Sequence, residues 1–303
     1  MEPIYLYNQN FFWLGKAKKL IKKFLGKDFG GPQSVFDSLT LGLNELGIPY
    51  KINASLPKVP SVVCVLSGVD TLLWAIQLKQ QGKIRKIIAG PNLVVGSEDY
   101  GGIIKNPLID IFIAPSQWVK DFYHKAVPQM REKIRIWPAG VNLPALQETE
   151  KIYDFLVYNK IKDGKLSQDI LNFLNSQNFK CTVLSYGDFK QQDYFKMLSK
   201  SKYLIYLSES ESQGLAMFEA WARGIPTLVW ERGFWQTDKY FWQGLTSSPY
   251  IAPENGMRFK DFEEFKKVLP QFLSTGFSSY EFTRINFSNK VCAQKYLEIV
   301  NNA

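Results

Sequence analysis

Residues 208–230, SESESQGLAMFEAWARGIPTLVW, combine a polar glycine-bearing turn, a helical segment and a buried strand. The preceding run, KYLIYL at 202–207, is apolar and rich in strand-forming residues, and so is PTLVW at 226–230. Apolar residues at helical spacing between these runs predict a helix that begins near Gln213 or Gly214. The order is therefore strand, turn, helix and strand, and the free N–H groups where such a helix begins can hold a phosphate.

Two glutamates, Glu211 and Glu219, bracket this turn and have seven residues between them. Along a continuous helix that spacing corresponds to about 12 Å. Carboxylates accept hydrogen bonds from vicinal hydroxyls, so a ligand with a sugar at each end and a diphosphate between them fits the pair. A nucleotide-sugar has this layout. The alternative is a pair of solvated glutamates, and the accompanying Gly214, Gly224 and Pro226 weigh against it.

The pattern S-x-x-E-S-Q-G-L-A-x-x-E-A-x-A-x-G-x-P resembles the donor-site motif of retaining glycosyltransferases of the GT-B fold, in the group 1 or family 4-like class. The resemblance implies an α/β protein with two Rossmann-like domains facing across a cleft and a C-terminal helix that crosses back to the N-terminal domain. It implies that Glu219 binds the nucleotide ribose and that Glu211 reaches the donor sugar. It further implies that the backbone of the turn contacts sugar and phosphate, through Ser212, Gln213, Gly214 and Leu215.

The composition is that of a soluble globular protein: 303 residues, 46% hydrophobic and 21% charged. This length suits one large domain or two of about 150 residues. Three widely spaced cysteines, Cys64, Cys181 and Cys292, predict buried thiols in a reducing compartment, with neither a disulfide nor a zinc site. No apolar run approaches a membrane span, and residues 1–13 lack the features of a signal peptide. A cytoplasmic location is expected.

The formal net charge of +9 is concentrated in the first half of the chain, largely in one segment. Six lysines lie between Lys16 and Lys27, on the polar side of a predicted amphipathic helix. This pattern suits reversible attachment to an anionic membrane surface, on the inner face of the membrane, and does not suit nucleic acid. A helix packed on its own domain with solvated lysines is an equal alternative. The predicted membrane contacts are Lys16, Lys18, Lys19, Lys22 and Lys23.

Apolar strand-like runs alternate with helical segments twice along the chain, which predicts two parallel sheets covered on both sides. The first series predicts an N-terminal Rossmann-like domain over residues 1–142, and the resemblance implies that it is the acceptor domain. A polar linker at 143–152 separates it from a nucleotide-sugar-binding domain at 153–285, and 286–303 form the crossing helix. The predicted strands are 3–8, 61–66, 84–89, 109–114, 134–137, 153–158, 181–185, 202–207 and 226–230.

Two further sets of residues match the resemblance. Gly30 and Gly31 follow the first strand, as does the glycine-rich loop of these transferases, although a Lys-rich insertion precedes them here. Lys160 follows the first strand of the second domain, where the family places a cation against the diphosphate. Lys165 is the candidate for a second cation, and Lys162 competes with it. A solvated lysine loop is the alternative interpretation.

The resemblance thus implies a hexosyltransferase-type enzyme that needs no metal and no cofactor besides its nucleotide-sugar donor, and that acts on a glycan or lipid-linked acceptor. The family often carries a histidine in the N-terminal domain near the donor sugar, whereas this chain has Gly90-Pro91-Asn92 there and its single histidine, His124, in a helix. A non-catalytic nucleotide-sugar-binding protein or a membrane-surface module on the same fold is therefore an alternative. An epimerase or phosphorylase is a third. No readable pattern identifies the base, the sugar or the acceptor.

Overall fold

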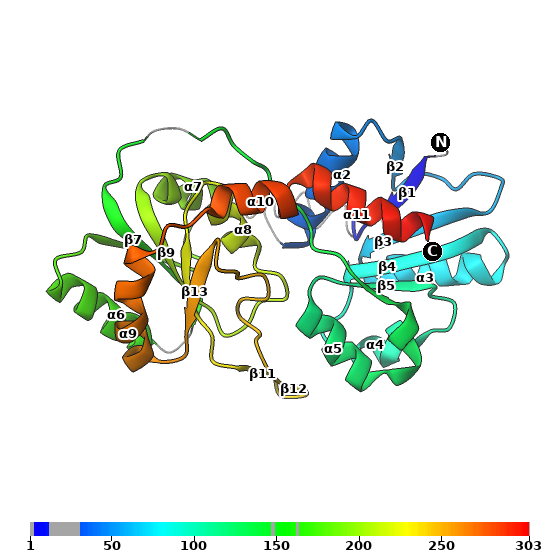
Figure 1. Ribbon diagram of the computed structural model, residues 1–303. Helices are drawn as coiled ribbons and strands as arrows, with labels where there is room; N and C mark the ends of the chain where they lie inside the picture. Colours follow the sequence, from blue (N-terminus) through cyan, green and yellow to red (C-terminus); the bar gives the residue numbers. More distant parts are fainter. Residues whose placement is uncertain (1–2, 12–30, 147–148, 162–163, 303) are drawn as a thin grey trace. The chain divides into compact units, whose positions relative to one another are not determined.

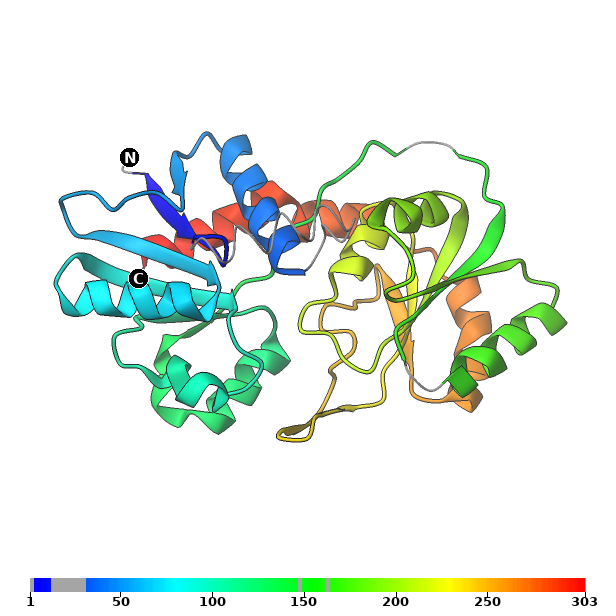
Figure 2. The ribbon, with the colours of Figure 1, turned by 180° about the vertical axis from the view of Figure 1, so that it is seen from behind.

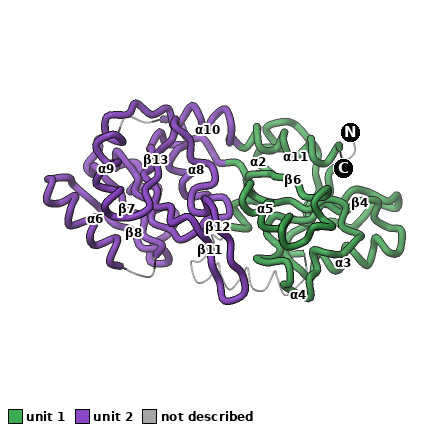
Figure 3. The backbone as a smooth tube through the Cα atoms, turned by 60° about the horizontal axis from the view of Figure 1, so that its bottom comes forward, with its two compact units in different colours: residues 1–140, 289–303 green, residues 141–288 purple. Residues whose placement is uncertain are grey.

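The computed structural model describes residues 3–11, 31–146, 149–161 and 164–302. The predicted lysine contacts between Lys16 and Lys23, Gly30 and Lys162 lie outside these ranges. The chain divides into two compact units, coloured separately in Figure 3. Unit 1 comprises residues 1–140 and 289–303, and unit 2 comprises residues 141–288.

Unit 1 is built on a parallel sheet, six strands of which lie in the described residues, and the apolar strands at 4–7 and 111–114 are buried along their whole length. Strands with no polar alternation are buried on both faces, which requires helices on each side. The strand order is β2-β1-β3-β4-β5-β6. Their bounds are β1 Ile4–Tyr7, β2 Tyr50–Ile52, β3 Ser61–Ser67, β4 Ile84–Asn92, β5 Ile111–Ala114 and β6 Ile134–Ile136.

The helices of unit 1 include two at its ends that pack against each other, α2 Gly31–Glu45 and α11 Asn289–Asn301. A Cβ atom at Gly42 of α2 would lie 2.1 Å from the main-chain oxygen of Asn289, so only glycine allows this approach. The other helices in the described residues of unit 1 are α3 Val69–Gln80, α4 Asp99–Gly102, α5 Gln117–Ala126 and the 3₁₀ segments η1 Ile103–Lys105 and η2 Pro128–Lys133.

Helix α11 completes the core of unit 1. The indole N–H of Trp137 donates to the main-chain oxygen of Cys292 at 2.8 Å, and the Trp137 and Tyr296 rings meet edge to face at 4.8 Å. Both rings are fully buried. The chain therefore returns to the first unit through its last helix, as the sequence resemblance implied.

The three cysteines are free thiols. Cys64 and Cys292 are buried as predicted, and burial raises the pKa of each thiol to about 12. Cys181 departs from the prediction and is partly exposed, because it begins an edge strand of unit 2.

Unit 2 repeats the arrangement with a parallel sheet whose described strands follow the order β13-β10-β9-β7-β8. Three of these strands, β7, β9 and β13, are labelled in Figure 1. The strands are β7 Tyr153–Asn159, β8 Cys181–Ser185, β9 Ser201–Leu207, β10 Thr227–Trp230 and β13 Gly256–Phe259. The helices are α6 Gly164–Ser176, α7 Gln191–Ser199, α8 Leu215–Trp221, α9 Phe262–Ser274 and α10 Ser279–Phe287. A separate antiparallel hairpin, β11 Phe234–Gln236 and β12 Phe241–Gln243, extends beyond the sheet and is drawn in yellow in Figure 2.

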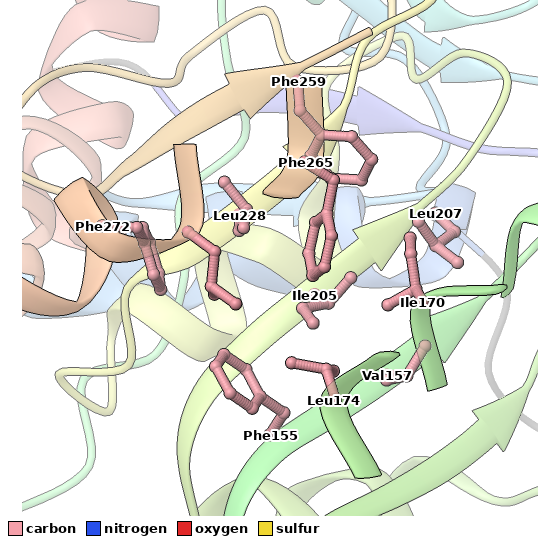
Figure 4. Packing of buried hydrophobic residues seen from close by; sticks show 11 residues of the cluster. Phe155, Val157, Ile170, Leu174, Ile205, Leu207, Leu228, Phe259, Phe265 and Phe272 are labelled. Carbon is pink, nitrogen blue, oxygen red and sulfur yellow. The ribbon is translucent and has the colours of Figure 1, made fainter. Parts of the chain in front are cut away.

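The two faces of the unit 2 sheet carry different layers because side chains alternate along each strand. Val157 and Ile205 lie on the face that packs against α6 and α9 in a fully apolar cluster, shown in Figure 4. Their neighbours Tyr158 and Tyr206 lie on the opposite face and stack at 5.0 Å, and the Tyr194 ring of α7 meets Tyr158 at 5.2 Å. This second, tyrosine-rich layer contacts the turn of residues 208–214 through the hydrogen bond from the Tyr206 hydroxyl to Glu211.

Candidate functional site

The candidate site lies at the carboxyl ends of β7 and β9, which are neighbouring parallel strands. Lys160 directly follows β7, and the turn of residues 208–214 directly follows β9. The main-chain N–H of Lys160 donates to the main-chain oxygen of Leu207 at 2.8 Å. The carboxyl ends of parallel strands share one edge of the sheet, so Lys160 and Glu211, which are 51 residues apart in sequence, meet there.

Lys160 and Glu211 form an ion pair, with 2.8 Å between the ammonium nitrogen and the carboxylate Oε1. The Lys160 side chain is 30% exposed and that of Glu211 is 12% exposed, so the pair is shielded from solvent on most sides. The ammonium also lies 4.8 Å from the centre of the Tyr186 ring. Tyr186 follows β8, and its main-chain N–H donates to Asn159 at the end of β7. The cation is thus held between an aromatic face and a carboxylate.

The Glu211 carboxylate is oriented by residues at the end of β9. Its Oε1 accepts hydrogen bonds from the Tyr206 hydroxyl at 2.8 Å and from the Ser208 hydroxyl at 2.9 Å, in addition to the Lys160 contact. Its main-chain N–H donates to the oxygen of Thr246 at 2.8 Å. Charge-assisted bonds of this kind are shorter and stronger than neutral ones, so the side chain has a defined position.

Helix α8 begins at Leu215, close to its predicted start. Gly214 precedes it with φ of 87°, in the left-handed region, and an added Cβ would lie 2.4 Å from the Met217 side chain. A glycine is therefore required at this turn. Ser212 is exposed in the turn, and Gln213 is buried. Because Glu211 lies before the helix, the helical separation of about 12 Å expected from the sequence does not apply to Glu211 and Glu219.

Glu219 lies within α8 and is contacted by Gln191 of α7 and by Arg223 from the turn that follows α8. The Gln191 amide at the start of α7 donates to its Oε1 at 2.6 Å. Arg223 donates to the main-chain oxygen of Glu219 at 2.8 Å and stacks over the Phe195 ring at 4.0 Å. Burial raises the pKa of the Glu219 carboxyl to about 7, against the smaller opposing effects of Gln191 and Arg223. At neutral pH this carboxyl is close to its titration midpoint.

The structure places the remaining predicted residues on other elements. Lys165 is the exposed second residue of α6. Gly31 is the exposed first residue of α2 in unit 1, and no atom lies within 4 Å of a Cβ built there. His124 lies in α5, as predicted, and burial is the main cause that lowers its pKa. Gly90, Pro91 and Asn92, at the position where the resembling family often has a histidine, are the last three residues of β4.

The part of the chain that the structure describes contains neither a metal-binding cluster nor a membrane-spanning helix. No group of three or more His, Cys, Asp or Glu residues there is arranged to hold a metal ion. Among the described helices, none has both the length and the apolar character needed to cross a bilayer.

No family model matches the sequence, and no curated protein matches it. Solved structures do match. The chain superposes on the lipopolysaccharide outer core galactosyltransferase WaaB in its apo form, with a TM-score of 0.61 and 12% identity over 100% of this chain and 99% of that one. Sucrose-phosphate synthase from Thermosynechococcus elongatus gives a TM-score of 0.55 and 12% identity, with 100% and 99% coverage. TarM gives 0.53 and 16% identity over 87% of this chain and 58% of that one.

Identities this low establish the fold and nothing finer. Two parallel α/β units in one chain, matched over the full length of WaaB, define the GT-B fold with two Rossmann-like domains. The fold class predicted from residues 208–230 is therefore confirmed.

Proposed function

We propose that this protein is a glycosyltransferase that moves a sugar from a nucleotide-sugar donor to an acceptor, with retention of configuration and without a metal ion. The observation that carries the proposal is the Lys160–Glu211 pair at the carboxyl edge of the unit 2 sheet, in a GT-B chain whose next helix bears Glu219. Ligands of open α/β sheets bind outside the carboxyl ends of the strands, which is where Lys160 and Glu211 lie and where the helix that bears Glu219 begins.

Each of the three side chains has a distinct proposed role. The Glu219 carboxylate accepts hydrogen bonds from the ribose hydroxyls. Lys160 faces the diphosphate and stabilises the negative charge that grows on it as the glycosidic bond breaks, which is the main catalytic contribution. Glu211 contacts the donor sugar, and the backbone of Ser212 to Leu215 lies against the sugar and phosphate. Lys165 is a second candidate for the diphosphate.

In the proposed reaction the acceptor hydroxyl attacks from the face that the leaving group vacates. Its proton passes to the departing phosphate oxygen, so the reaction needs no side chain as general base. Fixed cations and N–H groups replace a metal ion in neutralising the diphosphate. The proposed acceptor is a glycan or a lipid-linked glycan, reached by a cytoplasmic enzyme that attaches to the membrane surface through Lys16 to Lys23.

A thermal-shift screen against UDP, GDP, ADP and their sugars tests the donor assignment. A ligand at 100 times its dissociation constant stabilises a protein by about 2.7 kcal/mol, enough for a clear rise in Tm. The ligand found should then be turned over to free nucleoside diphosphate, and NMR of the product should show the anomeric configuration of the donor. A protein stabilised by no member of the series, or an inverted product, refutes the corresponding part of the proposal.

A non-catalytic nucleotide-sugar-binding protein is the second candidate, favoured by Asn92 where the resembling enzymes have a histidine loop. Binding without release of nucleoside diphosphate, in the presence of a panel of acceptors, would support this candidate over the transferase.

A further inference from the structure

A second carboxylate, Glu231, lies directly after β10 and is only 5% exposed. Its Oε2 accepts three consecutive main-chain N–H groups, those of Thr246 at 3.0 Å, Ser247 at 2.8 Å and Ser248 at 3.2 Å. The Ser248 hydroxyl donates to the same oxygen at 3.3 Å, and Oε1 accepts from the main-chain N–H of Gly233 at 3.1 Å. Successive N–H groups converging on one point bind anions, and here the anion is a side chain of the same protein.

This arrangement is fixed from several sides. Thr246, Ser247 and Ser248 are all fully buried, so their N–H groups depend on Glu231 for hydrogen bonding. The Arg258 guanidinium donates to the Ser248 hydroxyl at 2.8 Å and to the Ser248 main-chain oxygen at 3.1 Å. A buried carboxylate is costly unless its hydrogen bonds are complete, so the 246–248 segment and Glu231 hold each other in place.

The other side of the 246–248 segment contacts the turn that carries Glu211. The main-chain oxygen of Thr246 accepts a hydrogen bond from the main-chain N–H of Glu211 at 2.8 Å. The Ser247 hydroxyl donates to the main-chain oxygen of Glu209 at 3.1 Å. Thr246 thus accepts a hydrogen bond from Glu211 through its main-chain oxygen and donates one to Glu231 through its main-chain N–H. A continuous chain of hydrogen bonds runs from the end of β10 to the turn after β9.

We infer that Glu231 is a positioning residue for the sugar end of the donor site, acting through Thr246 and Ser247 on the turn that bears Glu211. The link to a sugar rests on the proposed function, whereas the link between Glu231 and the turn does not. Glu219 is held separately, by Gln191 of α7. Loss of the Glu231 carboxylate should therefore loosen the sugar end of the site and leave the ribose end unchanged.

The central test compares Glu231→Gln with the parent by hydrogen exchange and mass spectrometry, on peptides that cover 209–211 and 246–248. Glutamine keeps the size of the side chain but removes its charge and one acceptor oxygen. The loss of a hydrogen bond to a charged acceptor shifts the equilibrium between the closed segment and its open form by about ten-fold or more. We expect exchange at least about ten-fold faster in both segments, with β9 and α7 unchanged. Faster exchange at 246–248 alone would overturn the inference. Glu263→Gln, which removes an exposed carboxylate of the same unit, is the matched control and should change neither segment.

If Glu231→Gln does not fold, Ser247→Ala tests the link between the 246–248 segment and the turn. This variant removes the hydroxyl contact to Glu209 and leaves the three N–H groups on the carboxylate. Exchange should become faster at 209–211 and not at 246–248, and unchanged exchange at 209–211 would contradict the inference.

A ligand measurement distinguishes positioning from general support of the fold. UDP, GDP and ADP are each compared with their glucose conjugates on parent and Glu231→Gln. For the pair that the parent binds, the variant should lose about ten-fold in affinity for the conjugate and less than about two-fold for the diphosphate alone. Equal losses for both would reduce Glu231 to a structural role. A parent that binds none of these ligands refutes the proposed function, and hydrogen exchange still decides the link to the turn.

Discussion

The raised pKa of Glu219 makes a quantitative prediction about stability and pH. The carboxyl has a pKa of about 7 in the folded protein, against an ordinary value of 4.5, because burial disfavours its charged form. Between these two pH values the folded state binds about one more proton than the unfolded state. The stabilisation from the protonated carboxyl is therefore complete below pH 4.5 and is lost as pH rises through about 7.

The size of the effect follows from the width of that interval. Each pH unit contributes about 1.36 kcal/mol, so the interval from 4.5 to about 7 corresponds to about 3 kcal/mol. Glu219→Gln has a similar shape and cannot titrate, and its amide can still face Gln191. The difference in free energy of unfolding, parent minus variant, should fall by about 3 kcal/mol across this range and then level off above pH 8.

Urea denaturation of the ligand-free parent and Glu219→Gln at half-unit steps from pH 4.5 to 8.5 measures this difference. Other titrating groups are common to both proteins and cancel in the subtraction. Parallel curves would show that Glu219 ionises at its ordinary pKa and would refute the burial argument. A difference that increases with pH would mean a lowered pKa, opposite in sign to the one expected here.

The other predictions concern ligands and turnover. Lys160→Ala should lower kcat by about 10²-fold or more and change donor affinity little, because a fixed cation acts mainly on charge that develops in the transition state. Steady-state kinetics test this, and a variant with a changed KM and an unchanged kcat would contradict it. Glu211→Ala should reduce turnover more than it reduces affinity for the nucleoside diphosphate. Calorimetry with the diphosphate measures that affinity, and a larger loss of affinity than of turnover would contradict the prediction. EDTA should leave the rate of donor turnover unchanged, and a sensitive enzyme would contradict the metal-free mechanism. Replacing Lys18, Lys19, Lys22 and Lys23 by Gln should abolish cosedimentation with anionic vesicles, and equal sedimentation of parent and variant would return these lysines to a solvated surface.

The sequence predicted the two sheets well because their strands are continuous apolar runs bounded by clear turn residues. It missed β2, β13 and the hairpin β11–β12: β13 has four residues, and β2, β11 and β12 have three each. Strand β13, GMRF, has no apolar periodicity of its own and becomes a strand by pairing with β10. At Gly256 a Cβ would lie 2.0 Å from the main-chain oxygen of Thr227, so close pairing selects glycine there. The strand conformation of β13 therefore depends on pairing with a strand that is distant in sequence, and the local sequence does not predict it.

The same limit explains which site residues were missed. Glu211 and Lys160 were predicted because each belongs to a recognisable pattern next to a strand end. Gln191 contacts Glu219 from 28 residues away, and Glu231 contacts amides 15 to 17 residues ahead. An isolated glutamine at a helix start or a glutamate after a strand is ordinary in sequence. Only the fold gives these residues their partners.

The two glutamates of the candidate site, Glu211 and Glu219, are held by different parts of unit 2. Glu211 depends on the ends of β7 and β9 and on Thr246, whereas Glu219 depends on α7 and Arg223. Substitutions in the support of one glutamate need not disturb the other, because contacts that share no partner contribute nearly additively. In the proposed enzyme, the choice of sugar and the affinity for the nucleotide are therefore separable. Changes around Glu231 should alter the first, and changes around Gln191 the second.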